Sequence, residues 1–445
     1  LARETAATYK KDFNYPEITV KEETEGNIEE MVSVEIKNPE LCPRYIARVV
    51  KNVKIGQSPD WMKRRLKACG IRAINNIVDI TNYVMLDVGL PMHAFDNKIV
   101  DAINVIESDG EMTVDESIKK PEINSKEDLI AAIKNSGMVG LGGAGFPTYA
   151  KFASSKPLET LIINGAECEP FITSDTATMV EKTAEIKTAI EAIAKYFDVK
   201  NIILGIEKGN KEVQAKMEEL ASAIPNMSVK VLPNIYPQGG EKVLVYHTTG
   251  KVIKVGELPI DVGCVVVNCS TMAGIGTYLL TGMPLVERCI TVDGSAVKEP
   301  KIIVAPVGTP LKDVFDFCGG FTEEPFSVIY GGPMMGVAVP DLTAPVLKQT
   351  NAILALTKKD TSVPKETACI RCGACVTNCP FGISAPAITK AYKNKDAEAA
   401  IKAGAELCML CGCCSYNCPA NRPLVQTNKL PKDFVKEYKE KEANK

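Results

Sequence analysis

Two cysteine motifs with identical spacing constrain this 445-residue chain more than any other feature of its sequence. "CIRCGACVTNCP" and "CMLCGCCSYNCP" both follow C-x2-C-x2-C-x3-C-P, a pattern typical of proteins that carry two [4Fe–4S] clusters. Three closely spaced thiolates bind three corners of one cubane, and the fourth cysteine, which precedes a proline, reaches the other cluster. The spacing therefore predicts two clusters, one bound by Cys369, Cys372, Cys375 and Cys418 and the other by Cys408, Cys411, Cys414 and Cys379.

Four-cysteine zinc sites are the alternative interpretation, because zinc is also bound by C-x2-C pairs. Zinc sites need two pairs for each metal, and they rarely use a third cysteine that is followed by x3-C-P. Cys413 lies outside the pattern, and we expect it to be a small buried residue. The chain has sixteen cysteines and only two histidines, so its composition favours metal or redox chemistry and argues against histidine-based catalysis.

The composition of the chain is that of an ordinary soluble protein. Its net charge of −3 gives no general attraction to nucleic acid or to an anionic membrane. The first residues lack the pattern of a signal peptide, and no apolar run approaches the roughly 20 residues that span a bilayer. We therefore expect a cytoplasmic chain that can dock on a membrane partner.

The pattern of apolar and polar residues divides the chain into parts. Apolar runs such as "TLIING", "NIILGI" and "CVVVNC" alternate with helical stretches across residues 125–283, which predicts an α/β domain with a largely buried sheet. Residues 284–345 are expected to form a small β-rich module, and residues 364–430 a helical cysteine-rich domain. The remaining parts are an N-terminal segment at 1–97, a linker at 98–124 and a charged, solvated tail at 431–445.

The segment "MVGLGGAGFPTYAKF" contains a G-x-G-x-x-G pattern made by Gly140, Gly142 and Gly145. A Rossmann fingerprint must follow a strand, but this loop follows the helical pattern "LIAAIKNSGM", so a Rossmann site is rejected. The glycines still let a ligand approach backbone N–H groups ahead of a helix that starts near Pro147. The loop is therefore predicted to bind an anionic ligand.

Three further polar segments follow predicted strands. They are "NGAECEP" with Asn164, Glu167 and Glu169, "YPQGGEK" with Tyr236, Gly239, Gly240 and Glu241, and "VNCST" with Asn268 and Thr271. Asn, Gly and Glu also favour ordinary surface turns, so no single segment is decisive. Together with the glycine loop, they indicate a ligand site at the strand ends of one α/β domain.

The glycine loop, "INGAECEPF" and "YPQGGEK" resemble the NADH- and flavin-binding subunit of respiratory complex I. They are more similar still to the C subunit of the Rnf-type, ion-translocating ferredoxin:NAD+ oxidoreductase, which "GGPMMG" (331–336) and the twin cysteine motifs also resemble. The resemblance covers about residues 98–430. It implies an α/β flavin- and NADH-binding domain, a small β-grasp (soluble-ligand-binding) module, and a helical, ferredoxin-like domain with two [4Fe–4S] clusters.

The resemblance also implies which residues bind the cofactors. A non-covalent FMN would lie against the glycine loop, Lys151 and the polar segments, and NAD(H) would stack over it near Phe146, with Glu169 and Glu241 close to its ribose and nicotinamide. "AECEP" replaces the "DEGEP" of the complex I subunit, which leaves the flavin contacts around Glu167 open. The residues implied are Gly140, Gly142, Gly143, Gly145, Phe146, Lys151, Asn164, Glu167, Glu169, Tyr236, Gly239, Gly240, Glu241, Asn268 and Thr271.

The implied function is electron transfer between NAD(H) and ferredoxin through FMN and the two clusters, coupled to ion translocation. No side chain needs to act as nucleophile or general base, because the redox chemistry belongs to the cofactors. Expected partners are a ferredoxin-like iron–sulfur subunit and membrane subunits, on the cytoplasmic face of the bacterial cell membrane. Two alternatives stay open: the equivalent subunit of a soluble, electron-bifurcating enzyme, and a zinc-containing docking module.

The first 97 residues depart from this family. Residues 42–96 resemble the β subunit of phenylalanyl-tRNA synthetase, at the start of its editing-associated region. The match stops near Asn97 without a linker and contains only part of that domain, whereas a natural fusion normally contains whole domains. We therefore interpret the segment as a splice or a misassigned piece of sequence, and we expect no nucleic-acid binding from its basic residues at 63–67.

Overall fold

The computed structural model describes residues 33–36, 45–50, 53–69, 71, 73–88, 102–105, 114, 118–361 and 365–443. The chain divides into two units, Leu1–Thr113 and Val114–Lys445, and each is described by itself.

The described part of the first unit consists of two short strands and two helices. Arg65 lies over the rings of Trp61 and Tyr83, so one member of the basic cluster packs on its own unit. The buried carboxylate of Asp79 accepts a hydrogen bond from Ser58 Oγ at 2.5 Å. The elements are β1 (Ser33–Ile36), which pairs in parallel with β2 (Ala102–Val105), α2 (Asp60–Ala68) and α3 (Asn76–Val88).

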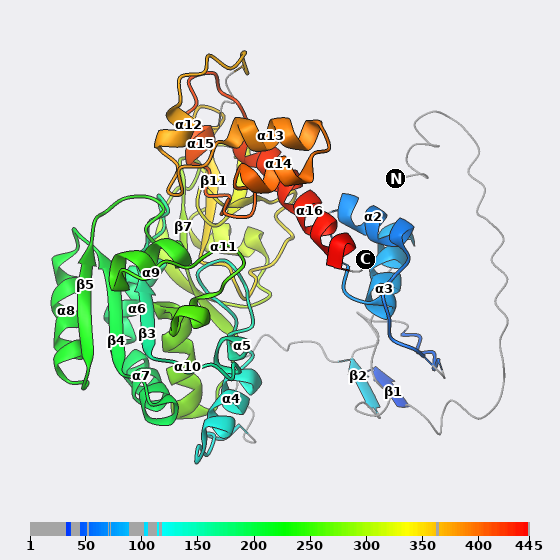
Figure 1. Ribbon diagram of the computed structural model, residues 1–445. Coiled ribbons are helices and arrows are strands. Elements are labelled where there is room, and N and C mark those ends of the chain that lie inside the picture. Colours follow the sequence, from blue (N-terminus) through cyan, green and yellow to red (C-terminus); the bar gives the residue numbers. More distant parts are fainter. Residues whose placement is uncertain are drawn as a thin grey trace. The chain divides into compact units, whose positions relative to one another are not determined.

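The second unit begins with an α/β domain built on a four-stranded parallel sheet of order β5-β4-β3-β6 (Figure 1). The strands are β3 (Thr160–Gly165), β4 (Asn201–Glu207), β5 (Met227–Leu232) and β6 (Cys264–Asn268). The helices are α4 (Lys126–Asn135), α5 (Tyr149–Phe152), α6 (Ser174–Glu181), α7 (Thr183–Phe197), α8 (Lys211–Ser222), α9 (Glu241–Thr249), the short 3-10 helix η2 (Pro259–Val262) and α10 (Cys269–Thr281). The predicted α/β architecture is confirmed.

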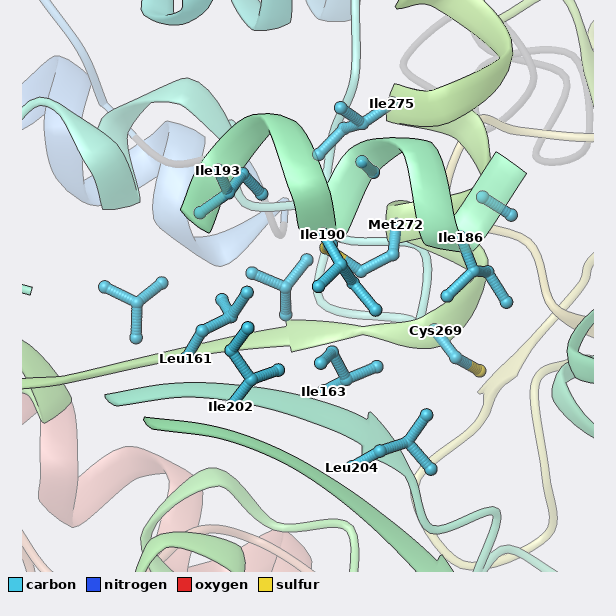
Figure 2. Packing of buried hydrophobic residues seen from close by; sticks show 14 of the residues in the cluster. Leu161, Ile163, Ile186, Ile190, Ile193, Ile202, Leu204, Cys269, Met272 and Ile275 are labelled. Carbon is cyan, nitrogen blue, oxygen red and sulfur yellow. The ribbon is translucent and has the colours of Figure 1, made fainter. Parts of the chain in front are cut away.

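The central strands of this sheet are apolar on both faces because helices cover both. Leu161 and Ile163 point to the side where the isoleucines of α7 and the start of α10 pack, as Figure 2 shows. Ile162 points to the opposite face, where it packs with Leu244 and Val245 of α9. Successive side chains of a strand face opposite ways, so a continuous apolar run such as "TLIING" marks a strand buried on both sides.

A second sheet follows, with the strand order β10-β9-β11-β7-β8. Its strand β11 is fully buried and runs parallel to β7 but antiparallel to β9. This strand lies beyond residue 345, so the sheet takes in residues past the range that the sequence indicated. The elements are β7 (Glu287–Asp293), β8 (Lys301–Pro306), α11 (Leu311–Phe317), β9 (Ser327–Tyr330), β10 (Val337–Ala338) and β11 (Ala352–Leu356).

The cysteine-rich part is helical, as predicted. The last helix, α16, extends through most of the segment expected to be a solvated tail, because Val435 is buried against Ile388 and small residues such as Ala400. Within the described residues, no helix is both long enough and apolar enough to cross a membrane. The helices are α12 (Ala374–Thr377), α13 (Ala385–Lys393), α14 (Ala397–Lys402), α15 (Cys413–Tyr416) and α16 (Leu424–Ala443).

Candidate flavin and iron–sulfur sites

The order of strands in the parallel sheet creates a switch point at the carboxyl ends of β3 and β6, and we call this edge the crevice. From β3 the chain continues to β4 and β5 on one side and then returns to β6 on the other, so the direction of winding reverses between β3 and β6. Ligands of open α/β sheets bind outside the carboxyl ends of strands at such a point. Asn164 and Asn268, two predicted site residues, are register partners at this edge.

The glycine loop folds back on itself beside this crevice. Gly140 N–H donates to Phe146 O at 2.8 Å, and Gly145 N–H donates to Gly140 O at 3.1 Å. The loop follows α4, which agrees with the rejection of a Rossmann site, and the helix after it, α5, has a single turn. Among the described residues, none accepts a hydrogen bond from the exposed N–H groups of Gly142, Gly143 and Ala144, so these amides are available to an anionic ligand.

Two predicted residues on α10 and its cap hold the glycine loop against the sheet. Thr271 Oγ1 accepts a hydrogen bond from Leu141 N–H at 3.0 Å. Asn268 caps α10 by accepting from Thr271 N–H at 3.2 Å, and a Cβ on Gly142 would lie 3.3 Å from Asn268 Nδ2. The structure therefore brings Gly142, Asn268 and Thr271 together, as a shared ligand site requires.

The segment "YPQGGEK" closes the other side of the crevice. Asn164 Nδ2 donates to Gly239 O at 3.0 Å, and a Cβ on Gly239 would lie only 2.6 Å from Ala166 O. Glu241 forms an ion pair with Lys151 at 2.8 Å. Lys151 Nζ also donates to Val266 O at 2.8 Å, so this cation is fixed at the sheet edge. These predicted residues are also brought together.

The carboxylates of Glu167 and Glu169 both accept hydrogen bonds from backbone N–H groups of the protein. Glu167 caps α6, since its two carboxylate oxygens accept from the N–H groups of Asp175 at 2.7 Å and Thr176 at 2.9 Å. Burial, and then the nearby Asp175, raise the pKa of Glu167 to about 7. The Glu169 carboxylate accepts from Met334 N–H at 3.1 Å and Met335 N–H at 2.8 Å, in the "GGPMMG" loop, and burial raises its pKa. Direct contacts of these two carboxylates with a cofactor stay predictions, as does stacking of a nucleotide on the half-exposed Phe146.

The "YPQGGEK" segment also contacts the second cysteine motif. The hydroxyl of Tyr236 donates to Cys411 O at 2.7 Å. A Cβ on Gly240 would lie 2.5 Å from Met409 Cε, and a Cβ on Gly412 would lie 3.0 Å from Met334 O. The crevice and the cysteine motif are therefore packed directly on each other, with the "GGPMMG" loop at the same junction.

The predicted cluster ligands line two separate cavities. One is lined by cysteines 369, 372, 375 and 418, and the other by cysteines 379, 408, 411 and 414, together with 375 and 413. Each cavity is thus lined by cysteines of both motifs. This agrees with the prediction that the fourth cysteine of each motif binds the cluster of the other motif. No three His, Cys, Asp or Glu side chains of the described residues converge as they would around a single metal ion.

The structure identifies residues at the crevice that the sequence did not. Asp175 is buried and accepts hydrogen bonds from Asn268 Nδ2 at 2.6 Å and Ser270 Oγ at 2.5 Å. Glu207 ends β4, and its buried Oε1 has no hydrogen-bond partner among the described residues. Neither belongs to a recognisable motif, and an acidic residue at a helix start or a strand end is too common to single out.

Glu207→Gln should make stability less dependent on pH. Burial raises the pKa of Glu207 from 4.5 to about 7, so the folded state loses stability as the pH rises between these values. The variant should therefore be more stable than the parent at pH 8, by about 1 kcal/mol given the partial exposure of the side chain, and no more stable at pH 4. Urea unfolding at both pH values measures this, and an equal difference at the two values would contradict it.

Three family models match the second unit. A Nuo51 FMN-binding domain matches residues 133–277, an SLBB domain matches residues 289–338, and a 4Fe-4S dicluster domain matches residues 366–422. A B3/4 domain matches residues 41–145, which extends from the first unit into the second and overlaps the FMN-binding match at residues 133–145. The resemblance of residues 42–96 to phenylalanyl-tRNA synthetase, and their interpretation as a splice, stay predictions.

Two relatives are similar to this chain over about two thirds of its length. The C subunit of the proton-translocating ferredoxin:NAD(+) oxidoreductase complex of Clostridium ljungdahlii is 40% identical over 300 residues, which are 66% of this chain and 65% of that protein. The C subunit of the ion-translocating oxidoreductase complex of Rhodobacter capsulatus is 40% identical over 321 residues, which are 72% of this chain and 62% of that protein. The chain is a homologue of these C subunits. It spans less than two thirds of the length of either relative.

The predicted fold class is thus confirmed, and so are the predicted similarity to these C subunits and the matches to flavin- and iron–sulfur-binding domains. A solved NAD+-reducing [NiFe]-hydrogenase covers 70% of this chain and 61% of its own chain, with 17% identity and a TM-score of 0.48. This sequence identity is lower than the 40% identity to the two C subunits, and no conclusion about fold or function is drawn from it.

Proposed function

We propose that this chain transfers electrons between NAD(H) and ferredoxin as the C subunit of an ion-translocating oxidoreductase complex. The observation that carries the proposal is the junction at which the crevice of the α/β domain packs on the second cysteine motif, through Tyr236 and Gly240. A nucleotide-binding crevice in contact with an iron–sulfur cavity is the arrangement that passage of electrons from a flavin to a cluster requires.

The residues of the crevice fit a flavin nucleotide. The open amides of Gly142, Gly143 and Ala144 suit an anionic ligand group. Lys151 supplies a fixed cation, and the two register partners Asn164 and Asn268 supply amide groups at the sheet edge. When bound, FMN accepts two electrons together from NADH and releases them one at a time, which the one-electron clusters require. The protein orients the nucleotide and excludes water from the junction.

The eight cysteines fit two [4Fe–4S] clusters, and their positions give the clusters different places in the route. The cavity of cysteines 379, 408, 411 and 414 adjoins the crevice, since Cys411 O accepts the Tyr236 hydroxyl. The other cavity contains the exposed Cys369 and Cys372. We infer that electrons enter or leave the crevice through the first cavity and reach a partner protein through the second.

Metal and flavin analysis of the anaerobically purified chain tests the proposal. About eight irons and one FMN per chain, with a visible absorbance that NADH bleaches, are expected. Zinc in place of iron, without flavin, would show instead a zinc-containing docking module.

Tyr236→Phe tests the contact between crevice and cluster. Loss of the hydroxyl leaves Cys411 O without its donor, so the junction should loosen while the crevice keeps its own hydrogen bonds. We expect cluster reduction to slow by about tenfold more than flavin reduction by NADH, because a lost hydrogen bond of about 1.4 kcal/mol corresponds to that factor. Stopped-flow absorbance separates the two steps, and equal slowing of both would contradict the proposed route.

The partners of this chain are also part of the proposal. The relatives are named as subunits of ion- or proton-translocating complexes, so we propose that the chain docks with a ferredoxin-like iron–sulfur subunit and with membrane subunits, peripherally on the cytoplasmic face of the cell membrane. Purification with membrane subunits supports this arrangement. Purification in a soluble complex would support the equivalent subunit of an electron-bifurcating enzyme.

A further inference from the structure

Arg288 is a buried cation that connects two parts of the second unit. It belongs to β7 of the five-stranded sheet and is only 4% exposed. Its Nε donates to Thr350 O at 3.0 Å, just before β11 of the same sheet. Its Nη2 donates to Leu141 O at 3.2 Å, in the glycine loop of the α/β domain. One side chain therefore joins the second sheet to the loop at the crevice.

Leu141 is held from two directions. Its carbonyl accepts from Arg288, and its N–H donates to Thr271 Oγ1 at 3.0 Å on α10. The side chain of Leu141 is also buried. The peptide groups on either side of Leu141 are thus fixed in direction, and the three open amides of the loop follow immediately in the chain.

The same segment before β11 contacts the loop at two more places. Lys348 Nζ donates to Gly137 O at 3.1 Å, ahead of the loop. The side chain of Gln349 lies against Gly145 at its end, where a Cβ would be 3.5 Å away. The beginning and end of the loop contact the segment before β11, and its middle contacts Arg288 of β7.

These contacts restrict the conformational freedom that the glycines give the loop. A segment rich in glycine loses much conformational freedom when it is fixed, and a loop that is not fixed beforehand binds its ligand more weakly. A buried charge is itself costly unless it has partners. Burial lowers the pKa of Arg288 to about 10, while the buried carboxylate of Asp175 acts in the opposite direction, so the side chain stays charged at neutral pH. An apolar residue would fill this position at lower cost but has no donor for either carbonyl.

We propose that Arg288 is a positioning residue that fixes the glycine loop in its binding conformation, which makes nucleotide affinity depend on the second sheet. The effect on affinity rests on the proposed function, because it takes the loop as a contact of FMN. The positioning itself is a property of the protein without cofactor.

Hydrogen–deuterium exchange and FMN titration of the full chain, with Arg288→Lys, test the inference. Lysine keeps the charge near Asp175 but carries all its donors on one nitrogen, so it does not reproduce the two separately placed contacts that Nε and Nη2 make. Exchange of the loop amides of Gly140, Leu141, Gly145 and Thr148 should become at least about tenfold faster in the cofactor-free protein. The dissociation constant for FMN should rise about 10- to 100-fold, because the loop must then be ordered on binding. The iron content should stay the same.

Two further variants complete the test. Ile290→Val removes a buried methyl group from the same strand, so it weakens the second sheet by about 1 kcal/mol without touching the loop; it should change neither loop exchange nor FMN affinity. Lys348→Met removes only the Gly137 contact and should cause a smaller loosening of the loop. It also supplies a measurement if Arg288→Lys does not fold.

The outcomes separate the inference from the proposed function. Unchanged loop exchange in both Arg288→Lys and Lys348→Met would overturn the positioning role. An equal loss of FMN affinity in Ile290→Val would also overturn it, because general weakening of the sheet would then suffice. A loosened loop with unchanged FMN affinity would uphold the positioning role and contradict the assignment of the loop to the flavin.

Discussion

Cys414→Ser is expected to halve the iron content of the chain, from about eight to about four irons. Cys414 lines the cavity that adjoins the crevice, together with cysteines 379, 408 and 411. With that cluster absent, reduction of the remaining cluster by NADH should fall at least about 100-fold, since the proposed route passes through the lost site. Reduction of the flavin by NADH should continue. Iron analysis and stopped-flow absorbance at flavin and cluster wavelengths measure the two effects.

Cys413→Ser is the matched control for this experiment. Cys413 is the preceding residue, is buried and lines the same cavity, but its Sγ lies 4.0 Å from Tyr236 O. We expect this variant to keep about eight irons, because the C-x2-C-x2-C-x3-C-P spacing leaves Cys413 out. Loss of iron from Cys413→Ser but not from Cys414→Ser would show that the predicted ligand set is wrong.

Gly239→Ala is expected to abolish most flavin binding without loss of iron. The added Cβ would lie 2.6 Å from Ala166 O, so the backbone of one of the two segments must move. Gly239 O also accepts from Asn164 at the strand end, and its N–H donates to Cys168 Sγ at 3.3 Å. Overpacking of this kind costs about 1–3 kcal/mol, which corresponds to an FMN affinity about 10- to 100-fold lower if the displaced residues are the flavin contacts.

Gly140→Ala separates distortion of the protein from a clash with the ligand. A Cβ on Gly140 meets Phe146 N at 3.6 Å, an ordinary contact, so the cofactor-free fold should keep its thermal stability. If FMN approaches the backbone there, its affinity should still fall. Fluorescence titration with FMN and thermal unfolding of both variants give the comparison. Full flavin binding by Gly239→Ala would remove this segment from the proposed site.

The sequence predicts this fold well where the information is local. The cluster ligands follow from cysteine spacing within two short segments, and the cavities agree with the predicted exchange. The parallel sheet follows from apolar runs that alternate with helical stretches. The sequence also indicates that a helix, and not a strand, precedes the glycine loop, and this helix is α4.

The contacts that join the parts could not be predicted. Arg288 and Leu141 are 147 residues apart in the chain, Glu169 and Met334 are 165 apart, and Tyr236 and Cys411 are 175 apart. In each pair a backbone group provides one of the two atoms, so its residue type carries no signal. At the C-terminus, "KEYKEKEANK" predicts a solvated segment, and most of its described residues are exposed, but they form the end of α16, whose packing through the preceding Val435 the charge pattern does not reveal.

The exchange of cysteines between the two cavities also has a consequence for how the protein is made. Cys379 of the first motif lines the cavity of the second, and Cys418 of the second lines that of the first. Metal binding at such sites contributes directly to the free energy of folding. Filling both cavities would therefore cross-link the two motifs, and a chain made when iron is scarce would lack that cross-link and open to proteases more often. Iron supply would then determine how much of this protein accumulates in the cell, in addition to how much of it is active.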